Sequence, residues 1–153
     1  MIVVIGVLAA ISIVAYSGVQ SRANDSAVQG DLSAAVKALE LFKIDNGVYP
    51  RNVGDLDAMA STAPLRASRG AYDVGTGNIY NYAFCFNAAG TSYGLAAKSK
   101  SGNSYYVSSA ISTVSSFSGW GTSVSTICPA MGQPTSGVWG YTGNTQSWQS
   151  WVR

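Results

Sequence analysis

The chain has 153 residues, of which only 10% are charged, and its net charge is +2. Ordinary soluble domains carry about 25% charged residues, so this surface must be polar mainly through hydroxyls and amides, which fits an extracellular or tightly assembled protein better than a free cytoplasmic one. The chain has no histidine, which excludes imidazole acid–base catalysis and histidine metal ligation. Its size allows one modest domain.

Residues 1–46 predict one long helix that is apolar first and amphipathic afterwards. Residues 1–16 carry no charge, and only Gly6 and Ser12 interrupt the apolar residues. A helix that is apolar on every side must be buried in protein or in lipid. Sixteen residues rise roughly 24 Å, which is short for a bilayer core of about 30 Å. A break into two helices near Ser17 and Gly18 is the alternative.

The second half of this helix has a single apolar stripe. Apolar residues recur at spacings of three and four, and the residues expected to pack on a sheet are Val28, Leu32, Val36, Leu39 and Phe42. Asn46-Gly47 supplies a helix stop, and Pro50 prevents the helix from resuming.

A connecting loop is predicted for residues 47–77, with a short helical turn at 55–59. Strands are predicted at 79–86, 93–97 and 104–109, separated by loops that contain Gly90 and Gly102, and one or two further short strands at 124–128 and 138–141. Three antiparallel strands need one covered face, and the helix stripe is the available cover. The expected fold is therefore α+β. It has an apolar helix at 1–21, its amphipathic half at 22–46, the connection at 47–77, and a sheet with a loop-rich C-terminal region at 78–153.

The two cysteines, Cys85 and Cys128, leave two interpretations open. In an exported chain we expect a disulfide between them, which would stabilise the fold by about 4 kcal/mol in the loop-closure model. In a cytoplasmic chain they would be buried free thiols.

No catalytic or metal site is predicted. Serine without a histidine or a positioned lysine is not an activated nucleophile. Asp55, Asp57 and Asp73 lack the run of oxygen ligands that calcium loops use. We expect no enzyme activity, no metal and no cofactor.

The distal half is weakly basic and aromatic. After Asp73 there is no acidic residue, and the only charged side chains are Lys98, Lys100 and Arg153. These lysines either lie on a solvated face or attract anionic polymers such as DNA weakly. Trp139, Tyr141, Trp148 and Trp151 either pack against the sheet or form a platform for a host surface or glycan.

Two stretches near the N-terminus together resemble the type IV pilin family: residues 2–16 (IVVIGVLAAISIVAY) and residues 38–50 (ALELFKIDNGVYP). The resemblance covers about a third of the chain. It implies a head in which a helix packs on a sheet and a disulfide closes the C-terminal region. The Cys85 and Cys128 pair resembles that disulfide. The implied filament-core or membrane positions are Ile2, Val3, Ile5, Gly6, Leu8, Ala9, Ala10, Ile11, Ile13 and Tyr16.

The chain also departs from this family. Val14 replaces a proline common in the family's helix, and the family's basic leader and early acidic residue do not precede Ile2. We expect the sequence to begin inside a longer natural segment. A cleaved signal peptide is the competing interpretation, but the run lacks a basic start and a convincing cleavage site.

The resemblance implies an extracellular type IV pilus subunit used for attachment, motility or DNA uptake. Its expected partners are copies of itself, the pilus assembly machinery and, before assembly, the cytoplasmic membrane; contact with a host surface or DNA would be weak. The alternatives are a minor pseudopilin of a secretion or DNA-uptake machine and a membrane-anchored adhesive module. The lack of acids after Asp73 disfavours a secretion pseudopilin with a late calcium loop.

Overall fold

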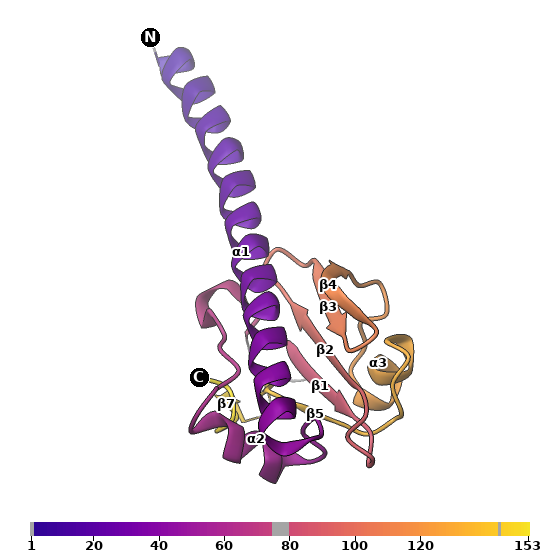
Figure 1. Cartoon of the computed structure of the whole chain (residues 1–153). Helices are drawn as coiled ribbons and strands as arrows, with labels where there is room; N and C mark the ends of the chain where they lie inside the picture. Colours follow the sequence, from indigo (N-terminus) through magenta and orange to yellow (C-terminus); the bar gives the residue numbers. More distant parts are fainter. Residues whose placement is uncertain (1, 75–79, 144) are drawn as a thin grey trace.

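The computed structural model describes residues 2–74, 80–143 and 145–153; within the first helix the side chains of residues 2, 9, 10 and 13–15 are not described. The fold is α+β, as predicted: a long helix lies across one face of an antiparallel sheet (Figure 1).

Helix α1 (Ile2–Asn46) is continuous for 45 residues, with no break at Ser17 or Gly18. At about 1.5 Å per residue it is roughly 68 Å long. It ends where predicted: the Gly47 amide donates to the Lys43 carbonyl at 2.7 Å, and Gly47 has a φ of +77°. That left-handed conformation is accessible to glycine without strain, which explains the stop.

The second half of α1 carries the core. Val28, Leu32 and Leu39 are fully buried, and Val36 and Phe42 are partly buried against the same cluster. The stripe therefore lies on the sheet, while the first half of α1 protrudes beyond the head (Figure 1).

One five-stranded antiparallel sheet forms the head, in the order β4-β3-β2-β1-β5. Its strands are β1 (Tyr82–Phe86), β2 (Tyr93–Lys98), β3 (Ser104–Ser108), β4 (Ile111–Ser116) and β5 (Gly137–Trp139). The register places Phe84 beside Leu95, and Leu95 beside Val107. The first three strands agree with the prediction. Residue 79, where the first strand was predicted to start, lies outside the described residues.

Both faces of this sheet are covered. Phe84 and Leu95 belong to the cluster under α1, whereas their neighbours Ala83, Cys85 and Ala96 belong to a second cluster on the opposite face. Successive strand residues point to opposite faces, so these strands are apolar throughout rather than alternating.

The cover of the second face corrects the prediction of a strand at 124–128. This segment is helix α3 (Val124–Ala130), which begins after Ser123, whose side chain accepts a hydrogen bond from the Ser125 amide. Its buried residues include Ile127 and Cys128. The disulfide Cys85–Cys128 joins β1 to α3 with a Cα–Cα distance of 5.5 Å, so the predicted pairing is confirmed.

The remaining elements frame the head. Helix α2 (Val53–Ala60) contains the predicted helical turn and is capped by Asn52. The short 3-10 helix η1 (Arg69–Ala71) follows, and β6 (Tyr141–Thr142) pairs with β7 (Ser147–Trp148). A parallel bridge between Leu65 and Val152 ties the C-terminal residues to the connecting loop.

Candidate assembly surface

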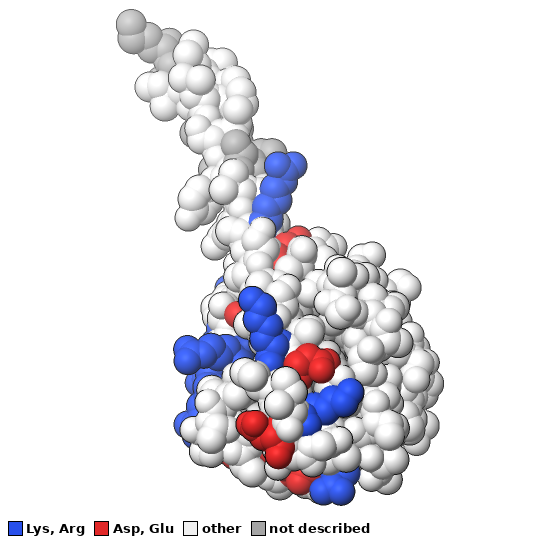
Figure 2. Space-filling model, in the orientation of Figure 1, with Lys and Arg blue, Asp and Glu red and all other residues white. Residues whose placement is uncertain are grey.

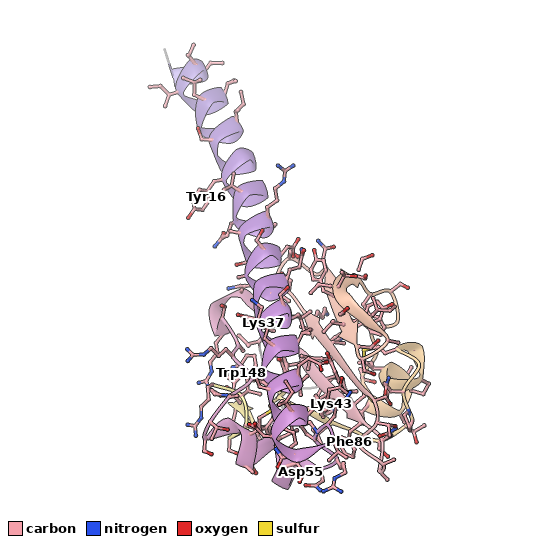
Figure 3. The ribbon with its side chains drawn as sticks, in the orientation of Figure 1. Tyr16, Lys37, Lys43, Asp55, Phe86 and Trp148 are labelled. Carbon is pink, nitrogen blue, oxygen red and sulfur yellow. A yellow bond between two sulfur atoms is a disulfide. The ribbon has the colours of Figure 1, made fainter. Side chains whose placement is uncertain are left out.

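The most unusual surface of this protein is the protruding half of α1. Apolar side chains there are exposed by between 53% at Val7 and 78% at Val3. The large ones are Val3, Val4, Ile5, Val7, Leu8, Ile11, Tyr16 and Val19. Figure 3 shows Tyr16 projecting from this segment, away from the head.

Predicted core positions fall on this segment throughout. Val3, Ile5, Gly6, Leu8, Ile11 and Tyr16 are exposed in the single chain. Ile2, Ala9, Ala10 and Ile13 belong to α1, but their side chains lie outside the described residues. The space around Gly6 is open in the single chain, since a Cβ built there has nothing within 4 Å.

The protruding segment is also uncharged. No Asp, Glu, Lys or Arg precedes Arg22. Figure 2 shows the charged side chains on and near the head, with the helix beyond them free of charge. Among the residues that the structure describes, no helix has the length and apolar character needed to cross a membrane.

Two carboxylates of α1 fix the head to the helix near the neck, the point where α1 leaves the head. Asp25 accepts hydrogen bonds from Ser101 at 2.5 Å and from Asn103 at 2.8 Å, which holds the loop between β2 and β3. Burial alone would raise the pKa of Asp25, but its side-chain hydrogen bonds together lower it below its usual value.

The second carboxylate is Asp31, which holds η1 and its approach. It accepts hydrogen bonds from the Ser68 amide at 2.6 Å and from the Tyr72 hydroxyl at 3.0 Å. Burial, together with the nearby charge of Asp31, raises the pKa of Tyr72 far above its usual value, so this hydroxyl remains a donor. These hydrogen bonds therefore fasten the head to the helix at this level.

The other end of the head, which we call the base, is formed by the end of α1 and by α2. Tyr49 donates a hydrogen bond to Glu40 at 2.7 Å, and Lys43 lies over the Tyr49 ring at 4.5 Å. Burial, followed by the hydrogen bond to Glu40, raises the pKa of Tyr49 to about 12.

A groove of about 410 Å³ opens at the base. Its lining is Leu41, Phe42, Asp45, Asn46, Ala58, Met59, Thr62 and Ala63. Leu41 is 54% exposed, and Ile44 beside it on α1 is 77% exposed. The base therefore presents a second apolar area, separate from the protruding segment. It was not predicted from the sequence, although Leu41 and Ile44 are apolar residues that lie off the buried stripe.

The candidate binding residues of the tail do not form one platform. Trp151 is buried, 1% exposed, among Tyr82 and Phe84, which corrects its assignment as a surface residue. The physical reason is the Leu65–Val152 bridge, which draws the C-terminal residues into the core.

Trp139 and Trp148 are half-buried and lie in different aromatic groups. Trp139 stacks on Tyr80 with 4.6 Å between ring centroids, whereas Trp148 packs edge-on against Tyr72 at 5.3 Å. Arg69 lies over Trp148 at 5.6 Å.

The two candidate lysines differ in their surroundings. Lys98 pairs with Asp73 at 3.2 Å, so its charge is largely offset, whereas Lys100 is exposed. Within the described part of the chain, no group of three or more Cys, Asp or Glu side chains is arranged to hold a metal ion.

Comparison with known proteins gives no relative: no protein-family model, no curated protein and no solved structure matches this chain. Function is therefore inferred from the residues and their arrangement.

Proposed function

We propose that this chain is the repeating subunit of an extracellular filament of the type IV pilus kind. The observation that carries the proposal is the protruding, uncharged half of α1, whose large apolar side chains have no cover in the single chain. In the filament these segments pack together as the core, and the heads form the outer layer.

The energetics favour assembly. Burying one exposed Val, Leu or Ile side chain contributes about 1.5–3 kcal/mol. Association costs about 4–15 kcal/mol in lost freedom, so several of the eight large side chains from Val3 to Val19 offset it. Uncharged helices also avoid the penalty of burying unpaired charges.

The head suits dense packing in an outer layer. Its charge is low, and the disulfide and the Asp25 and Asp31 hydrogen bonds keep it rigid. A subunit that does not change shape on assembly loses less conformational entropy. Before assembly we expect the apolar segment to lie in the cytoplasmic membrane, which cell fractionation tests.

Two competing functions remain. One is a pseudopilin, which forms only short assemblies, and the other is a membrane-anchored adhesive module. The adhesive module is the weaker of the two, because Trp151 is buried and the remaining candidate tryptophans lie in separate aromatic groups. A pseudopilin is distinguished by filament length in the assay below.

Assembly of the full chain tests the proposal. The protein is held in detergent, the detergent is removed, and the product is examined by electron microscopy with helical reconstruction. We expect long filaments with residues 3–19 at the centre. Ile5→Lys places a charge in the core and should abolish them, whereas the matched control Thr113→Lys, at an exposed position on β4, should not.

Two outcomes would overturn the proposal. One is a wild-type chain that stays monomeric after detergent removal. The other is an Ile5→Lys chain that polymerises like the wild type, because the protruding segment would then not form the core.

A further inference from the structure

The base of the head carries an acidic residue that has no partner in the described part of the chain. Six of the seven acidic residues, all of them described, are held by a hydrogen bond or an ion pair: Asp25, Asp31, Glu40, Asp55, Asp57 and Asp73. Asp45 has neither among the described residues. It is exposed and lies on the lining of the groove between α1 and α2, beside Phe42 and Met59.

The neck carries a basic residue, Arg22, that likewise has no charged or hydrogen-bonded partner among the described residues. Arg22 is exposed and is the first charge along α1. Val19, which is 68% exposed, lies about one helical turn before it on the same side. A filament core would bring this charge next to apolar segments, where an unpaired charge is costly.

Helix geometry relates these two places. Arg22 and Asp45 are 23 positions apart on one continuous helix, which is about 35 Å along its axis. The part of α1 that belongs to the head, residues 22–46, is about 37 Å long by the same rise. Two parallel copies displaced by one head length therefore bring the neck of one level with the base of the other.

The two residues also point in suitable directions. At 3.6 residues per turn, Arg22 and Asp45 lie about 140° apart around α1. Parallel helices placed side by side touch through opposite sides, about 180° apart, and a long arginine side chain covers the difference. A contact between two different patches of identical chains is heterologous, and it continues without limit unless it closes into a ring.

We propose that a second copy of this chain occupies the groove at the base: Arg22 of one subunit pairs with Asp45 of the next, and Val19 packs beside Phe42. This inference rests on the proposed filament function and specifies its register. Opposite charges at an interface mainly fix partner and alignment rather than supply affinity, so the apolar contacts drive assembly while this pair sets the stagger.

Charge reversal tests the pairing in the full chain. We expect Arg22→Glu and Asp45→Arg each to raise the critical concentration for assembly at least about tenfold, because each places like charges opposite one another. The double variant restores opposite charges and should assemble within about threefold of wild type. Matched controls are Lys37→Glu, on an exposed face of α1, and Thr113→Arg, at an exposed position on β4; both should assemble normally.

The outcomes separate the two proposals. If wild type does not polymerise, the filament function fails. If wild type polymerises and either single variant matches its control, or the double variant remains impaired although its thermal melt matches wild type, only the register proposal is overturned. Helical reconstruction supplies an independent readout, since the contacting copies should be displaced by about 35 Å along the filament.

Discussion

Gly137 occupies the tightest place beside the disulfide, and Gly137→Ala tests the packing described for the second face of the sheet. A Cβ at Gly137 would lie 2.6 Å from Cys128 Sγ and 2.9 Å from the Phe84 carbonyl oxygen. Both atoms are fixed, one by the disulfide and one by the β1 backbone. Overpacking of this kind costs about 1–3 kcal/mol.

The same substitution at Gly30 supplies the control. Gly30 is exposed within α1, and a Cβ there meets nothing within 4 Å. Replacing glycine by alanine in an open helical position stabilises a protein by about 0.5–1 kcal/mol. The two variants carry identical chemistry and should therefore shift stability in opposite directions.

Thermal melting of the full chain in detergent, monitored by circular dichroism, measures both effects. With about 2–4 °C per kcal/mol at this size, Gly137→Ala should melt roughly 2–12 °C below wild type and Gly30→Ala roughly 1–4 °C above it. An unchanged melting temperature for Gly137→Ala would refute the close contact between β5 and the disulfide.

Three further predictions concern the disulfide and two titrating groups. Replacing Cys85 and Cys128 by serine should cost about 4 kcal/mol, and a reducing agent should shift the wild-type melt by the same amount. Because the folded pKa of Asp25 is lowered, its stabilisation is present above the unfolded pKa and lost as pH falls through the folded one; Asp25→Asn should flatten the pH dependence of melting below about pH 4. Because the folded pKa of Tyr49 is raised to about 12, its contribution is present below the unfolded pKa and lost as pH rises through 12. Ultraviolet titration of Glu40→Gln should show Tyr49 ionising at lower pH, and an unaltered titration would contradict the hydrogen bond between them.

The long helix and the first three strands could be predicted because local signals agree with tertiary packing there. The stripe from Val28 to Phe42 has helical spacing, and Gly47 supplies a stop with the conformation it needs. The head's outer features were harder to predict. Strand β4 is a largely exposed edge strand with four Ser or Thr residues among its six, so no continuous buried face marks it in the sequence.

Helix α3 was misjudged because its residues favour another structure. Val, Thr and Ile are β-branched and are typical of strands. A weaker signal was present: Val124, Ile127, Cys128 and Met131 follow helical spacing, and Ser123 precedes them as a cap. The groove at the base could not be predicted, because it depends on how α2 returns against the end of α1.

The arrangement of the two cores has a mechanical consequence. In the proposed filament, a pull along the axis would enter each subunit through α1. It would reach the sheet as shear along the cluster from Val28 to Leu39, where the hydrogen bonds of Asp25 and Asp31 would resist the same sliding motion. The disulfide lies on the other face of the sheet, between β1 and α3. Such tension would be carried by many side chains that must slide together, and reduction of the disulfide would leave that path intact.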